Sequence, residues 1–141
     1  MSEPIVVERR IAAPPASVYA YLTEADKWIR WQGIGATLDP RKGGMFSLAM
    51  PNGANALGEF VELVPDARVV FTWGWLHHPS VAPGSSIVEI DLVPDGSGTL
   101  LTLTHRGLAD DEVAIHAEGW IHYLPRLVAV AQGENVGAEV S

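Results

Sequence analysis

The spacing at which apolar residues recur along the chain changes once, near Gly107, and this change limits the folds that the chain can adopt. Before Gly107, short β-branched and aromatic runs alternate with turn residues, which is typical of half-buried strands. After Gly107, apolar residues recur at helical spacing from about 111 to 132, a helix roughly 30 Å long at about 1.5 Å per residue. We therefore predict an antiparallel meander followed by one long helix.

Two shorter helices and a first strand precede the meander. The strand is expected at Ile5–Ile11 and the first helix over 15–23, where proline suits the opening turn. A second helical turn with Trp28 and Trp31 is expected to end near Gly33. The later strands are expected at 36–38, 44–50, 57–64, 69–75, 86–93 and 99–106. A curved sheet of this length can wrap around the closing helix, and a gap between them is the default ligand site.

Length, charge and cysteine content narrow the classes of function. The 141 residues fit one domain over 1–141, with a tail that we expect to be frayed from Glu134. A net charge of −8 argues against a nucleic-acid surface, and the absence of cysteine excludes thiolate chemistry. Neither a leader segment nor a membrane-spanning stretch is evident, so we expect a cytoplasmic protein.

Several short motifs follow one another in a recognisable order. They are Ala13-Pro14-Pro15, Val18-Tyr19, Trp28 with Trp31, Asp39-Pro40-Arg41-Lys42-Gly43-Gly44-Met45-Phe46, Gly58-Glu59-Phe60, Arg68-Val69-Val70-Phe71-Thr72-Trp73, Leu101-Thr102-Leu103-Thr104-His105 and Gly119-Trp120. In this order the chain resembles the START-like (SRPBCC, helix-grip) superfamily, in the branch named after the activator of the heat-shock-protein-90 ATPase. The resemblance implies an α+β helix-grip fold. Members bind lipids or polyketides, act as cyclase-like enzymes or serve as co-chaperones. The activator carries a further N-terminal docking region, which we do not expect in these 141 residues because the resemblance spans nearly all of them; this departure weakens the co-chaperone interpretation.

Aromatic side chains dominate the expected cavity wall. Phe71, Trp73 and Trp75 share one strand face. The alternation of the last strand places His105 on its apolar side, facing the expected cavity. His116 begins the apolar face of the long helix, so it is expected to face the same cavity. Aromatic rings of this size either fill a core or line a pocket. The residues expected to line it are Trp31, Phe46, Phe71, Trp73, Trp75, Leu103, His105, His116, Trp120, Tyr123 and Leu124.

The polar candidates each allow two interpretations. His105 and His116 either orient a ligand or move a proton, or they are structural histidines bonded to neighbouring groups. Glu59 shares strand parity with Val61 and so could approach the cavity, whereas Gly119 predicts a close approach of another backbone beside the helix. Two histidines are too few for a catalytic zinc site, so we expect neither a metal nor a cofactor.

The leading hypothesis is a module that binds one small hydrophobic or aromatic molecule between the long helix and the sheet. A polyketide cyclase- or dehydratase-like enzyme, with a histidine or Glu59 moving protons, is the first alternative. The second alternative is a chaperone-associated or dimerising interaction module, with surface aromatics around Trp75. Whether the chain catalyses a reaction stays open at this point.

Overall fold

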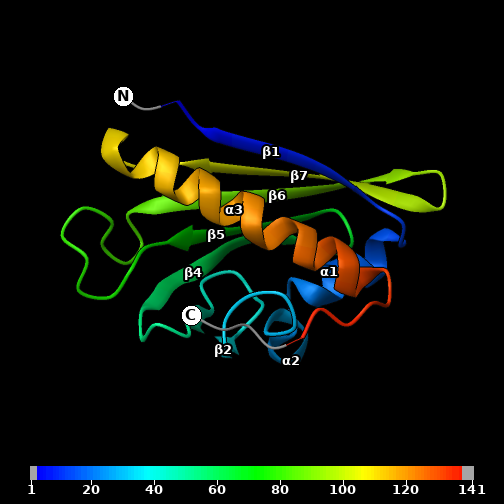
Figure 1. Cartoon of the computed structure of the whole chain (residues 1–141), viewed down its shortest axis with the longest axis horizontal. Helices are drawn as coiled ribbons and strands as arrows, with labels where there is room; N and C mark the ends of the chain where they lie inside the picture. The colour runs from blue at the N-terminus through cyan, green and yellow to red at the C-terminus, as the bar shows by residue number, and fades with distance from the viewer. Residues whose placement is uncertain (1–2, 138–141) are drawn as a thin grey trace.

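A long helix crosses one face of a seven-stranded sheet in the computed structural model, which describes residues 3–137 (Figure 1). The elements are β1 (Ile5–Ile11), α1 (Pro15–Tyr21), α2 (Ala25–Trp28), β2 (Gly35–Leu38), β3 (Met45–Ala49), β4 (Asn55–Val64), β5 (Arg68–Trp73), β6 (Ser86–Asp95), β7 (Gly98–Arg106) and α3 (Asp110–Ala131). All neighbouring strands are antiparallel, in the order β1-β7-β6-β5-β4-β3-β2. The α+β helix-grip fold expected from the sequence is confirmed.

The apolar stripe of α3 packs against the sheet. Its buried side chains recur at helical spacing and are His116, Trp120, Leu124, Leu127 and Val130. Opposite them, β7 buries Leu101, Leu103 and His105 in alternation, as period two predicts. Burying an apolar side chain of this size stabilises the fold by about 1.5–3 kcal/mol. None of the helices within residues 3–137 is long and apolar enough to cross a membrane.

Local chemistry fixes where α3 begins and ends. Asp110, Asp111 and Glu112 form its first turn, where the positive end of the helix dipole favours acidic groups. Gly133 adopts a φ of 92°, a left-handed conformation that glycine tolerates and that stops the helix. Beyond it, the carbonyl oxygen of Gly137 accepts a hydrogen bond from Nη2 of Arg126 at 3.0 Å. The remainder of the expected frayed tail, 138–141, lies outside the described residues.

The expectation that Glu59 approaches the cavity is wrong, because β4 contains a β-bulge. The register between β4 and β5 shifts between Phe60 and Glu62, which adds one residue and reverses the alternation of faces. Phe60 is therefore buried, while Val61 and Glu59 are exposed on the other face. The carboxylate of Glu59 does not approach the space between α3 and the sheet.

The sheet face opposite α3 carries a group of ion pairs centred on Arg68. The guanidinium contacts carboxylate oxygens of Glu62 at 2.8 Å, Asp91 at 2.6 Å and Glu89 at 3.5 Å. Glu89 in turn pairs with Arg106 at 3.1 Å. Hydrogen bonds to Glu62 and Asp91 raise the pKa of Arg68, so its guanidinium stays positively charged. These contacts connect β4, β5, β6 and β7 across their solvent face.

Candidate functional site

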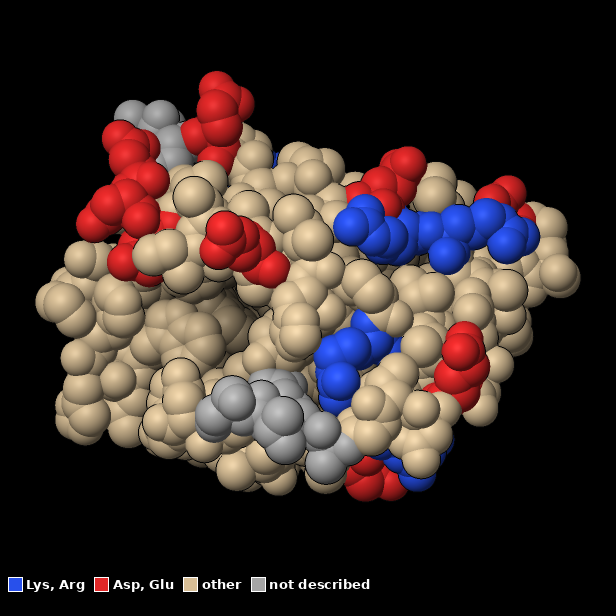
Figure 2. Space-filling model, in the orientation of Figure 1, with Lys and Arg blue, Asp and Glu red and all other residues tan. Residues whose placement is uncertain are grey.

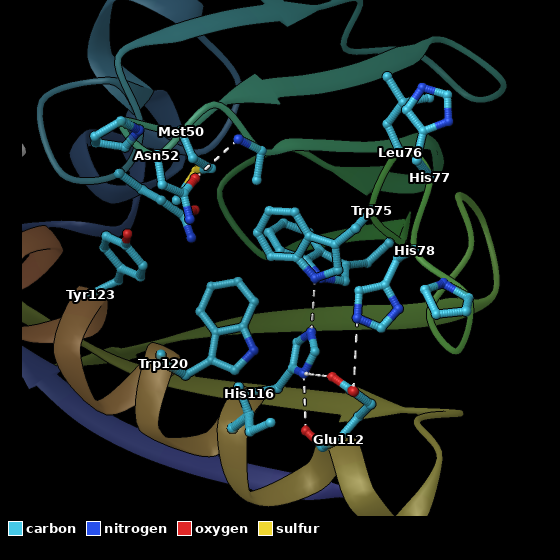
Figure 3. Close-up of a pocket in the computed structure, with 17 residues that line it drawn as sticks. Met50, Asn52, Trp75, Leu76, His77, His78, Glu112, His116, Trp120 and Tyr123 are labelled. Atoms are coloured by element: carbon cyan, nitrogen blue, oxygen red, sulfur yellow. Dashed lines mark hydrogen bonds and ion pairs between the residues drawn. The ribbon is translucent and has the colours of Figure 1, made fainter. Parts of the chain in front are cut away.

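One end of the space between α3 and the sheet is open and forms a hollow of about 680 Å³ (Figures 2 and 3). Its walls come from the N-terminal half of α3, the end of β5, the loop that follows β5 and the turn after β3. The lining residues are Gln32, Met50, Pro51, Asn52, Ala54, Trp73, Trp75, Leu76, His77, His78, Pro79, Glu112, Ile115, His116, Gly119, Trp120 and Tyr123. A hollow of this volume falls within the range that small-molecule sites occupy, about 300–1,000 Å³.

Backbone contacts beyond the end of β5 hold Trp75 in the wall. Gly74 permits a tight approach, because a Cβ there would overlap the carbonyl oxygen of Ala82. The next residue, Trp75, donates its backbone N–H to the carbonyl oxygen of Val81 at 2.7 Å and forms an isolated bridge with Ala56. The indole of Trp75 is thus fixed although it lies outside the regular strand.

His116 is held in one tautomer by its two neighbours (Figure 3). Nε1 of Trp75 donates a hydrogen bond to its Nε2 at 3.0 Å, and an indole nitrogen can only donate. Nδ1 of His116 must therefore carry the hydrogen, which it donates to the carbonyl oxygen of Glu112 at 2.9 Å. Both ring nitrogens are occupied within the protein.

His105 is held in the opposite tautomer. Its Nδ1 accepts a hydrogen bond from Nε1 of Trp120 at 3.0 Å, so its Nε2 donates to Oγ of Ser86 at 2.9 Å. Ser86 passes its hydroxyl hydrogen to the carbonyl oxygen of Trp73 at 2.8 Å. Burial, together with the nearby His116, lowers the pKa of His105 to about 3, so its imidazole is neutral. The structural interpretation of His105 is the one that these contacts support.

Glu112 lies between two histidines at the edge of the hollow (Figure 3). Its Oε1 lies 3.6 Å from Nδ1 of His116, and its Oε2 lies 3.7 Å from Nε2 of His78. Nδ1 of His78 accepts hydrogen bonds from the backbone N–H groups of Ser80 and Val81. The ring hydrogen of His78 is therefore on Nε2, which faces Glu112. Glu112 thereby connects the loop after β5 with the first turn of α3.

Trp73 carries a buried polar atom that the described residues leave without a hydrogen bond. Trp73 is only 2% exposed, and its Nε1 has no hydrogen-bond acceptor within residues 3–137. The indole packs instead among the rings of Trp75, Trp120 and His105, with centroid distances of 5.3, 5.4 and 6.1 Å. Burying a donor without a hydrogen bond costs free energy, which the packing of the indole must offset.

The structure divides the predicted site residues into two groups. Trp73, Trp75, His116, Trp120 and Tyr123 line the hollow. Six others lie in the packed interior instead: Trp31, Phe46, Phe71, Leu103, His105 and Leu124. Phe46 and Phe71 stack at 4.3 Å, and the ring of Trp28 fills the space beside both of them. This aromatic layer closes the middle of the space under α3, so only the end near the loop remains open.

Sequence patterns missed the residues that come from irregular segments. The turn residues Met50 and Asn52, the loop 76–79 and Gln32 line the hollow without lying on a periodic face. Glu112 could have been found, because it precedes His116 by four residues and four residues span about one helical turn.

Gly119 does not have the neighbour that we expected. A Cβ built on Gly119 would have no heavy atom within 4 Å outside its own helix, so no other backbone approaches it closely. The expectation of a tight backbone contact is therefore wrong. Gly119 instead lines the hollow, where its missing side chain enlarges the space between Trp120 and Ile115. Within residues 3–137, no group of three or more His, Asp or Glu side chains is placed to hold a metal ion.

Comparison with known proteins identifies relatives across most of the chain. The family described as Activator of Hsp90 ATPase homolog 1-like protein matches residues 12–132. A human protein named activator of 90 kDa heat shock protein ATPase homolog 1 is 24% identical over 119 residues. That match covers 84% of this chain but 34% of the human protein, so the chain spans about a third of that relative.

Solved structures agree with this relationship. An AHSA1-like protein from Rhizobium etli is 41% identical, with a TM-score of 0.72, over 100% of this chain and 94% of that one. The Aha1 dimer from Colwellia psychrerythraea has a TM-score of 0.84 over 96% of this chain and 100% of its own. At 20% identity, this second likeness shows the fold alone.

Proposed function

The chain belongs to the Activator of Hsp90 ATPase homolog 1-like family, and from this premise we propose that it binds one small apolar or aromatic molecule in the hollow under α3. One observation carries the proposal. The hollow of about 680 Å³ has aromatic walls, and the N–H groups of Trp75 and Trp120 are already bonded to histidines. The walls therefore offer apolar surface that a ligand could cover.

Apolar burial supplies the binding energy in this proposal. Each Å² of apolar surface removed from water contributes about 25 cal/mol, before the costs of association. The faces of Trp75, Trp120 and Tyr123 lie around the same space (Figure 3) and offer flat surfaces to a planar ligand. Rings that are fixed before the ligand arrives lose little freedom on binding, which favours affinity.

The described lining offers neither a usual nucleophile nor, in His116, the free histidine base that we expected of a cyclase-like enzyme. The described lining contains no serine, threonine, cysteine or lysine, the usual nucleophiles of covalent catalysis. The ring nitrogens of His116 both have partners, so it offers no free base. His77, at the exposed mouth, is the remaining imidazole of the lining without a described partner.

A fluorescent apolar probe tests the proposal directly. N-phenyl-1-naphthylamine, an uncharged dye that brightens in apolar surroundings, is titrated into the 141-residue chain and into two variants. Gly119→Leu adds a side chain where nothing lies within 4 Å outside the helix, so it fills the hollow. Ala114→Leu makes the same gain in size on an exposed position of α3 outside the lining.

We expect saturable binding of one dye per chain that Gly119→Leu weakens by at least about tenfold, or about 1.4 kcal/mol. Ala114→Leu should bind the dye as the parent chain does. Equal binding by all three proteins would place the dye elsewhere and contradict the proposal. Thermal unfolding of each variant confirms that both remain folded.

Family membership also favours a second candidate, interaction with a heat-shock-protein-90 ATPase. The observation is the family match itself, with the human activator as a relative. Stimulation of the purified ATPase by this chain would support the interaction, and no change in ATP hydrolysis would oppose it. Gly119→Leu separates the two functions, because filling the hollow should leave a surface interaction intact.

A further inference from the structure

We propose that the hollow selects uncharged aromatic ligands and rejects anionic ones, a preference set by the carboxylate of Glu112. This inference rests on the proposed binding function and adds the chemical class of the ligand. The preference arises from the charges in the wall of the hollow and not from the shape of the hollow.

No positively charged side chain opposes the negative charge in the described lining. Glu112 contributes one carboxylate, and neither lysine nor arginine lines the hollow. Figure 2 shows uncharged atoms inside the hollow and Asp and Glu gathered above it, over the N-terminal half of α3. The chain as a whole carries a net charge of −8, which adds to the same potential.

The immediate neighbours of Glu112 do not neutralise it. His116 and His78 lie 3.6 and 3.7 Å from its oxygens, and each imidazole accepts a hydrogen bond on its other side, as neutral rings do. The side chain of Glu112 is only 13% exposed, so water screens its charge incompletely.

A ligand carboxylate would lose its water in this hollow without gaining a counter-charge. Moving an ionised group out of water is costly unless a partner replaces the lost solvation. An uncharged ring with the same shape keeps the apolar gain and avoids that cost. An ammonium group would lose water as well, with one carboxylate as partial compensation.

Three competitors that share one ring system isolate the effect of charge. 1-Naphthol, 1-naphthoate and 1-naphthylmethylammonium are each used at pH 7.5 to displace N-phenyl-1-naphthylamine from the 141-residue chain. We expect naphthol to displace the dye at the lowest concentration and naphthoate to require at least about tenfold more.

Two charge-removing variants locate the source of the preference. Glu112→Gln should bring the displacing concentration of naphthoate closer to that of naphthol, so that the ratio of the two concentrations falls. Glu118→Gln removes the same charge from the same helix at an exposed position outside the lining. It should leave the ratio of naphthoate to naphthol unchanged.

The outcomes separate this inference from the proposed function. Naphthoate displacing the dye as well as naphthol, or ammonium displacing it best, would overturn the charge preference while leaving the binding function intact. An equal effect of Glu112→Gln and Glu118→Gln would assign the preference to net charge and overturn the role of Glu112. Absence of saturable dye binding would contradict the proposed function itself.

Discussion

Nε1 of Trp75 donates a hydrogen bond to Nε2 of His116 across 3.0 Å, joining the segment after β5 to α3. A second pair, Trp120 and His105, repeats the arrangement with the other imidazole nitrogen as acceptor. The two imidazoles lie perpendicular to each other at a centroid distance of 5.5 Å. Each indole thereby fixes the tautomer of the imidazole that accepts its hydrogen bond.

The two histidines should be neutral and in opposite tautomers. We expect a hydrogen on Nδ1 in His116 and on Nε2 in His105, because the other nitrogen of each ring accepts an indole N–H. Long-range proton–nitrogen NMR correlations distinguish the two forms at pH 7.5. The same tautomer in both rings would contradict the hydrogen bonds described here.

Acidification should destabilise the protein through His105. An unfolded histidine binds a proton below a pKa of about 6.5, whereas the folded ring binds one only near 3. The unfolded state therefore gains protons first, and stability is lost as pH falls from 6.5 towards 3, by at most about 1.4 kcal/mol per pH unit.

Chemical denaturation across this pH range checks the prediction about His105. His105→Gln keeps an acceptor for Trp120 but cannot titrate, so its stability should fall less steeply with acid. The matched control is His122→Gln, an exposed histidine on α3, which should keep the parent slope. Identical slopes in all three proteins would oppose the assignment.

Gly119→Ala should stabilise the protein by about 1 kcal/mol, the difference in helix propensity between the two residues. The added methyl group meets no heavy atom within 4 Å outside the helix, so it costs no strain. Urea denaturation measures the gain, and Ala114→Gly on the same helix should show a loss of similar size. Destabilisation by Gly119→Ala would mean that a neighbour lies closer than the structure shows.

Removing the guanidinium of Arg68 should cost about 1–2 kcal/mol of unfolding free energy, because three carboxylates lose one partner together. The loss should shrink at high salt, which screens the pairs that remain near solvent. Arg41→Ala is the control: its pair with Asp39 is far more exposed, and its removal should have little effect. Equal losses in the two variants would argue against a cooperative group.

Much of the fold could be predicted because it depends on local patterns. Alternation placed His105 on the buried face of β7, and helical spacing placed His116 and Trp120 on the buried stripe of α3. The β4 bulge escaped prediction, since an extra residue between Phe60 and Glu62 leaves no mark in the alternation that precedes it.

The boundary between core and hollow could not be predicted from period alone. Phe71 and Trp73 share a face of β5, yet only Trp73 reaches the hollow. The difference arises where Trp28 and Phe46 cover Phe71, through contacts between segments distant in sequence. The loop after β5 and the turn after β3 then determine which rings stay uncovered. Apolar residues do not recur at a regular spacing in either segment, so the sequence pattern does not predict their contacts.

The absence of a side chain at Gly119 contributes to the free volume of the hollow under α3. Position 119 lies in a regular helix, and a Cβ there would meet no heavy atom within 4 Å outside that helix, so a methyl group fits without moving the sheet. If the hollow binds a small molecule as we propose, variants of this chain with larger side chains at position 119 should admit only smaller molecules. A change at this position would also alter helix stability, because glycine is the weakest helix former apart from proline.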